Sequence, residues 1–153
     1  MNPPSPSDLF GDLFAAVQER GLFADSKTFA DAIPRRAPEA ILRDWKAAAA
    51  AGDAALAAFV AENFELPQDE AGVPPDARPL RDHIVELWAA LTRERVTPVP
   101  GASLLALPRR HVVPGGRFRE LYYWDSFFTM LGLVRSGRQD LVEDMIASFG
   151  SLF

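Results

Sequence analysis

Apolar residues recur at three- and four-residue spacing through most of this chain, and no stretch alternates apolar and polar positions as a half-buried strand does. That spacing places the apolar side chains of each segment along one face of a helix. It predicts about six helices and favours an all-α fold. The expected packing faces are Leu9, Phe10, Leu13, Phe14 and Val17; Ile41, Leu42 and Trp45; Leu56, Phe59, Val60 and Phe64; Leu80, Ile84, Leu87, Trp88 and Leu91; and Leu141, Val142, Met145, Ile146 and Phe149.

Residues that start and stop helices support the same division. Ser7 or Asp8 is expected to cap the first helix, and Gly21 is expected to end it. Pro38 suits the first turn of the second helix, and Asp53 is expected to cap the third. The helix boundaries are therefore expected where the apolar spacing begins and stops.

The segment 124–134 is apolar on nearly every side, which is typical of a helix buried by neighbours in all directions. Ser136 and Gly137 are expected to end it, and the one-sided helix at 141–149 follows. A buried helix joined by a tight turn to an amphipathic one is the repeating unit of an α/α toroid, in which inner helices line a central pit. About six helices are too few to close such a ring, so we expect a partial toroid preceded by N-terminal helices, with an ordinary small helical bundle as the alternative.

Composition excludes several classes of function. Sixteen basic and 21 acidic residues give a net charge of −5, and no basic cluster could neutralise a row of phosphates, so nucleic acid is not an expected partner. The chain has no cysteine, and neither His83 nor His111 has a second ligand at metal spacing, so both are expected to be packed or solvated. The charge-free apolar run at 127–134 is far shorter than the ~18 residues that a membrane span needs, so no membrane association is expected.

The first seven residues are rich in Pro and Ser, and we expect a flexible lead-in over 1–7 with one folded domain over 8–153. This start has neither the basic residues nor the apolar run of an export signal. Since such lead-ins also follow cleaved signals, both the periplasm and the cytoplasm stay open as the location of the protein.

The twelve residues 114–125 concentrate groups that could recognise a ligand. Gly115 and Gly116 allow a tight turn and close backbone approach, which can hold the following Arg117 in place. Its guanidinium is a planar fork of donors, while the neighbouring rings offer flat apolar faces and the carboxylates accept hydrogen bonds. This set suits a neutral polyhydroxylated ligand, because the C–H faces of a sugar pack on rings and its hydroxyls need bidentate partners.

The same residues also have structural interpretations. Tyr122, Trp124 and Phe128 have the spacing of rings on a buried helix face. Asp125 stands where a helix cap is expected, and Arg117 could form a structural ion pair with Glu120. Composition and spacing alone therefore leave a carbohydrate site and a packed helix end both open.

The segment Pro114-Gly-Gly-Arg-Phe-Arg-Glu-Leu-Tyr-Tyr-Trp-Asp125 resembles the first signature of the α,α-trehalases, P-G-G-R-F-x-E-x-Y-x-W-D-x-Y. It matches every specified position except the last, where this chain has Phe127 and lacks the hydroxyl. The segments 22–32, 80–93 and 128–133 resemble the corresponding regions of bacterial trehalases, so the resemblance covers nearly the whole chain.

This resemblance implies an inverting glycoside hydrolase with an (α/α)6 toroid of the six-hairpin glycosidase type, which splits trehalose into two glucose molecules without a metal or organic cofactor. It implies that Arg117, Phe118, Tyr122, Trp124 and Asp125 contact the sugar. The general acid and general base of the family lie beyond the signature, in later helices, so we expect no catalytic residue in this chain. We therefore expect this chain to be the N-terminal portion of a trehalase, and we expect this portion to be inactive by itself.

Two other interpretations assign the chain to different classes of protein. One is a non-catalytic helical carbohydrate-binding protein, and the other is a purely structural bundle. Trehalose and glucose are the expected ligands of a trehalase, and the inner-helix surface left exposed in a partial toroid also predicts self-association. Saturable binding of trehalose by a monomeric, cooperatively folded chain would favour the binding protein.

Overall fold

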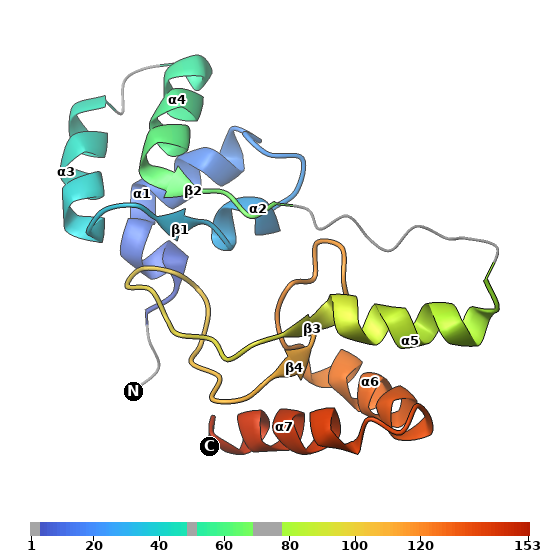
Figure 1. Ribbon diagram of the computed structural model, residues 1–153. Coiled ribbons are helices and arrows are strands. Elements are labelled where there is room, and N and C mark those ends of the chain that lie inside the picture. Colours follow the sequence, from blue (N-terminus) through green and yellow to red (C-terminus); the bar gives the residue numbers. More distant parts are fainter. Residues whose placement is uncertain (1–3, 49–51, 69–77) are drawn as a thin grey trace. The chain divides into compact units, whose positions relative to one another are not determined.

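A computed structural model describes residues 4–48, 52–68 and 78–153 (Figure 1). The chain divides into two compact units, Met1–Gln68 with Pro98–Leu104 and Asp69–Thr97 with Leu105–Phe153. Most of the described residues are helical, so the prediction of an all-α fold is confirmed. Within the described ranges, none of the helices combines the length and the apolar character that crossing a membrane requires.

The first unit packs its helices around a cluster of phenylalanine rings. Phe64 lies between two of them, with ring centroids 5.1 Å from Phe10 and 5.0 Å from Phe29, both in edge-on geometry. The strands β1 and β2 pair antiparallel, with Pro34 opposite Phe64. The elements are α1 (Pro6–Glu19), α2 (Lys27–Ala30), β1 (Ile33–Pro34), α3 (Pro38–Ala48), α4 (Asp53–Asn63) and β2 (Phe64–Glu65).

Helix α1 begins earlier than expected. Ser5 is its N-cap: the Ser5 Oγ accepts from the Asp8 backbone N–H at 3.2 Å, and the Asp8 carboxylate accepts from the Ser5 N–H at 3.0 Å. The prediction of Ser7 or Asp8 as the cap is therefore wrong, because this reciprocal pair caps the helix one residue before Pro6. Gly21 follows the helix end with φ +61, which the sequence predicts.

The expected cap of the third helix is displaced by one residue. Gly52 is the N-cap of α4, and Asp53 is the first helical residue. Phe64 does not lie on the face of this helix, because α4 ends at Asn63 and Phe64 begins β2. Phe64 is nevertheless buried, since the short strand directs its ring into the same core.

The second unit contains α5 (Leu80–Leu91), β3 (Thr92–Arg93), β4 (His111–Val112), α6 (Tyr123–Arg135) and α7 (Gln139–Gly150). β3 and β4 pair antiparallel, with Thr92 opposite Val112 and Arg93 opposite His111. The buried core of this unit is formed by Val112, Leu133, Leu141, Val142 and Met145.

A helical hairpin of α6 and α7 dominates this unit (Figure 1). Gly137 has φ +71, and the Arg138 N–H donates to the Leu133 carbonyl at 2.9 Å, so α6 ends at Ser136 and Gly137 as predicted. One face of α7 is buried, which confirms the prediction of a one-sided helix, although Ile146 is exposed rather than packed.

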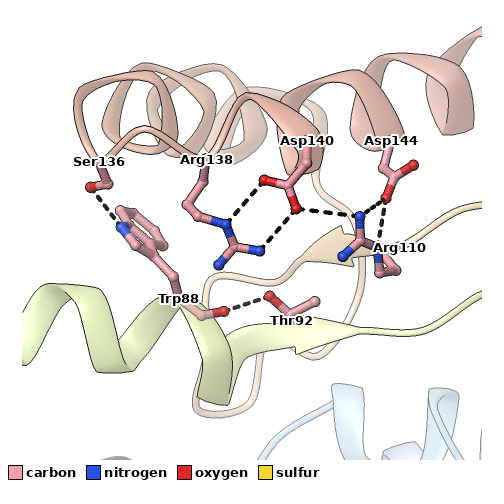
Figure 2. A network of polar contacts seen from close by, with 7 residues as sticks. All are labelled: Trp88, Thr92, Arg110, Ser136, Arg138, Asp140 and Asp144. Carbon is pink, nitrogen blue, oxygen red and sulfur yellow. Dashed lines mark hydrogen bonds and ion pairs between the residues drawn. The ribbon is translucent and has the colours of Figure 1, made fainter.

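Polar contacts join the elements of this unit around α7 (Figure 2). The Arg110 Nε donates to the Asp144 carboxylate at 2.7 Å, and a second Arg110 nitrogen lies 3.4 Å from Asp140. Arg138 donates to both carboxylate oxygens of Asp140, at 3.0 and 3.1 Å. These contacts tie the segment before β4 to the first turns of α7.

Candidate functional site

The signature segment begins with a tight turn in the second unit. The Gly115 N–H donates to the Phe118 carbonyl at 3.2 Å, and the Phe118 N–H donates to the Gly115 carbonyl at 3.1 Å. Gly115 and Gly116 have φ values of +100 and +59, which side-chain-bearing residues rarely adopt. The two glycines therefore allow the chain to reverse just before Arg117.

The turn rests on the end of α5. The Val113 N–H donates to the Leu91 carbonyl at 3.0 Å, and a Cβ placed on Gly115 would lie 3.0 Å from a methyl group of Leu91. A residue with a side chain at position 115 would therefore push the turn away from α5. The sequence alone could not indicate that Leu91 supports the Gly115 turn, because the two residues lie far apart in the chain.

Three predicted site residues contact one another in series beside this turn, in the order Arg117, Phe118 and Tyr122. The Arg117 guanidinium carbon lies 5.0 Å from the centroid of the Phe118 ring, within the range of a cation–π contact. The Phe118 and Tyr122 rings meet edge-on, with centroids 5.6 Å apart and an interplanar angle of 89°. The structure thus brings three of the five predicted site residues together, and it places Arg117 and Phe118 at the surface.

The other two predicted residues lie in the first turn of α6. Tyr122 is the N-cap of this helix, and Asp125 makes no capping hydrogen bond, so the interpretation of Asp125 as a helix cap is wrong. The first turn of α6 carries another side-chain hydrogen bond, in which the Ser126 Oγ donates to the Tyr122 carbonyl at 2.5 Å. Trp124 is 78% exposed, and the Asp125 side chain is also exposed. Both are therefore accessible to a ligand.

The expectation that α6 is buried on most sides is wrong. Among the described residues of this helix, only Ser126 and Leu133 are buried, and the core interpretation fails for Trp124 and Phe128, which are exposed. Trp88 of α5 covers one side at Gly132, where a Cβ would lie 3.0 Å from its ring, and α7 covers another. The remaining face carries apolar side chains that nothing described in this structure covers.

Trp88 also fixes α5 against the end of α6. Its indole Nε1 donates to the Ser136 Oγ at 2.9 Å (Figure 2). The sequence assigns Trp88 to a packing face, and the hydrogen bond adds a polar anchor that spacing does not reveal. Since α5 also supports the Gly115 turn, Trp88 and Leu91 together connect α6 to the signature segment.

His111 is buried in β4, as expected for a packed residue, and burial lowers the pKa of its imidazole. Within the described ranges, no group of three or more acidic or histidine side chains is arranged to hold a metal ion. The five predicted site residues comprise three aromatic rings, one guanidinium and one carboxylate.

The first unit has an open groove of about 460 Å³ that the sequence did not indicate. It lies at Gly11, whose φ of 40° and ψ of −113° interrupt α1, and it is lined in part by Leu42, Trp45 and Lys46. None of the predicted site residues lines this groove.

Comparison with known proteins gives a consistent result. A model of the Trehalase family matches residues 21–153. A periplasmic trehalase of Escherichia coli O1:K1 is 50% identical over 150 residues, which cover 97% of this chain and 26% of that protein. A periplasmic trehalase of Citrobacter koseri is 51% identical over 151 residues, with the same coverage of 97% and 26%. The chain therefore spans about a quarter of the length of these relatives.

Proposed function

This chain belongs to the trehalase family, and from that premise we propose that it supplies the sugar-contacting wall of a trehalose pocket. The family match across the signature segment carries the proposal. Its described helices are consistent with part of an α/α toroid, and the exposed Arg117, Phe118 and Trp124 are consistent with a surface that meets a ligand.

Each site residue has a role that fits its chemistry. The Arg117 guanidinium donates to vicinal hydroxyls, and its contact with Phe118 limits the orientations it can take. Phe118, Tyr122 and Trp124 offer ring surfaces to the C–H faces of glucose, and the Asp125 carboxylate accepts from a hydroxyl. None of these roles is a proton transfer to the glycosidic bond.

Inverting hydrolysis needs a general acid on the leaving oxygen and a general base on a water molecule at the opposite face, with carboxyl groups ~6.5–9.5 Å apart. We assign neither role to a residue of this chain. The reaction, hydrolysis of trehalose to two glucose molecules, then depends on groups from further family polypeptide. The purified 153-residue chain is expected to release no glucose from trehalose, because each missing proton-transfer group contributes about 10²–10⁴ in rate.

Two measurements on the purified chain test the proposal. In an NMR titration, millimolar trehalose is expected to shift the signals of Arg117, Phe118, Tyr122, Trp124 and Asp125, while a glucose assay stays at background. Trp124→Ala is expected to weaken these shifts, whereas Phe153→Ala, which removes another exposed ring, leaves them unchanged. Shifts confined to other residues would contradict the assignment of the site, and glucose release at the rate of a complete trehalase would contradict the assignment of catalysis.

The same titration distinguishes two hypotheses, that the chain is a non-catalytic binding protein and that it is a portion of a trehalase. Saturable, tight binding by a monomeric chain would support a binding protein, because such a module needs no further polypeptide. Weak binding by a self-associating chain supports the trehalase portion, and self-association is itself part of this proposal.

A further inference from the structure

The last turn of α5 contacts the chain on both sides of the predicted site. Trp88 and Leu91 are three residues apart and are therefore neighbours on this helix. Leu91 lies against the glycine turn, where a Cβ on Gly115 would be 3.0 Å from one of its methyl groups. Trp88 lies against α6 at Gly132, and its indole Nε1 donates to the Ser136 Oγ at 2.9 Å (Figure 2). All five predicted site residues lie in the chain between these two contacts.

Asp125 lies on the side of α6 that Trp88 packs against. Gly132 and Ser136 follow Asp125 by seven and eleven residues, so at 100° per residue both lie within about 20° of its direction around the helix. The stripe of α6 that contacts Trp88 therefore continues to Asp125, ~10 Å nearer the start of the helix. A rotation of α6 relative to α5 would thus redirect the Asp125 carboxylate relative to the turn that rests on α5.

Two contacts of different kinds oppose such a rotation. A Cβ on Gly132 would lie 3.0 Å from two atoms of the Trp88 ring, closer than the ~3.5–4.0 Å of an ordinary carbon–carbon contact, so the ring lies directly against the backbone of α6. One turn further along, the hydrogen bond to Ser136 holds the edge of the same ring. A single contact would let α6 pivot about that point, whereas two contacts fix both its separation from α5 and its rotation.

We infer that Trp88 is a positioning residue of the sugar site. Through Gly132 and Ser136 it sets the rotation of α6, and the rotation sets the direction of the Asp125 carboxylate relative to the Arg117 guanidinium. Trp88 acts here through α6 and not by contact with the sugar. Its importance for binding rests on the proposed function, but the orientation of α6 exists without sugar, so the two ideas can fail separately.

The first test needs no sugar. Residual dipolar couplings of the backbone N–H groups report the orientation of α6 relative to α5. Ser136→Ala removes the acceptor of the Trp88 N–H and is expected to change this orientation, whereas Ser136→Thr keeps a hydroxyl and retains it. Ser148→Ala is the matched control, because Ser148 is a buried serine of α7 whose Oγ donates to the Arg109 carbonyl at 3.4 Å. It is expected to leave the orientation of α6 unchanged.

The second test is the trehalose titration. Ser136→Ala is expected to raise the Kd about three- to tenfold, the range expected for the loss of one hydrogen bond, and Ser136→Thr to restore it. Trp88→Phe is expected to raise the Kd as well, and Ser136→Ala adds nothing further in that background, because the N–H is already gone. Ser148→Ala leaves the Kd unchanged. Urea denaturation of Ser136→Ala and Ser148→Ala shows whether lost stability alone explains a change in binding.

Three results overturn the inference: an orientation of α6 that Ser136→Ala does not change, a changed orientation with an unchanged Kd, or an equal effect of Ser148→Ala. If trehalose shifts no signal of the natural chain, the proposed function fails instead, and the dipolar couplings alone decide whether Trp88 orients α6. Far-UV circular dichroism checks that every variant keeps its helices.

Discussion

At the scale of single residues, Gly115 is held by two constraints at once. Its φ of +100 is costly for any residue with a side chain, and a Cβ there would lie 3.0 Å from Leu91. Gly115→Ala is therefore expected to destabilise the chain by ~1–3 kcal/mol in urea denaturation. Gly150→Ala, in the last turn of α7 with no atom within 4 Å, is expected to stabilise by up to ~1 kcal/mol. Equal effects of the two substitutions would contradict this account of the turn.

His111 is 2% exposed and stands opposite Arg93 in the strand pair. Burial is the main cause that lowers the pKa of its imidazole below 6.5; a backbone hydrogen bond with Arg109 partly offsets it, and the Arg93 charge adds to the lowering. The unfolded chain therefore binds this proton more readily than the folded chain. The stabilisation is complete above about pH 6.5 and is lost as the pH falls through the folded pKa.

His111→Gln is expected to flatten the pH dependence of the unfolding free energy between about pH 7 and about pH 5, because the titrating group is gone. The same measurement on His83→Gln, which changes the only other histidine, is the control. An unchanged slope in His111→Gln would mean that other groups cause the pH dependence.

At the scale of elements, the first turns of α7 depend on Asp140. Its hydrogen bonds from Arg138 are the main cause that lowers the pKa of this carboxylate to about 2, from 3.8. Because the folded pKa is the lower one, the stabilisation is present above about pH 3.8 and is lost as the pH falls towards about 2.

We therefore expect the amide protons at the start of α7 to lose protection against exchange between about pH 4 and about pH 2, and Asp140→Asn to show reduced protection already at neutral pH. Glu143→Gln replaces another acidic residue of the same helix and is expected to change little. Protection in Asp140→Asn equal to that of the natural chain would show that Arg110 and Asp144 hold the helix without Asp140 (Figure 2).

The boundaries of the elements could be predicted wherever local chemistry decides them. Gly21 and Gly137 end their helices because the αL conformation after a helix favours glycine, and both glycines are visible in the sequence. The strands could not be predicted, since each has two residues and too little length to show alternation. The sequence does not identify the N-cap of α1, because Ser5, Ser7 and Asp8 are all chemically suitable and only the geometry selects Ser5 among them.

At the scale of the whole molecule, each unit has its own core. Phe64 belongs to the core of the first unit and Met145 to that of the second, and both are buried. Phe64→Ala is expected to cost ~3–5 kcal/mol and Met145→Ala ~2–5 kcal/mol. Hydrogen exchange is expected to show the largest loss of protection in the unit that carries each substitution. Equal loss throughout the chain after either substitution would mean that the two cores unfold as one.

Helical spacing predicts which apolar side chains share a helix face, but it could not predict which of these faces are buried by neighbouring residues. For α1 the prediction is confirmed, because Phe10, Leu13 and Val17 are buried by neighbours within the same unit. For α6 it is wrong, because burial of Trp124 and Phe128 requires partners that the described part of the chain does not supply. The five site residues followed from the signature segment, and their contacts with sugar remain a prediction.

The route of the backbone has a practical consequence for dissecting this protein. The segment Pro98–Leu104 returns to the first unit, where Gly101 lies close to Pro34 and Pro38, although the residues on both sides of it belong to the second. A protease that cuts the chain once between residues 78 and 97 would therefore produce two fragments, each of which contains part of the first unit. Neither unit can be cloned as one uninterrupted stretch without either losing part of itself or carrying part of the other, and a linker that joins residue 68 directly to residue 98 would be the natural way to isolate the first.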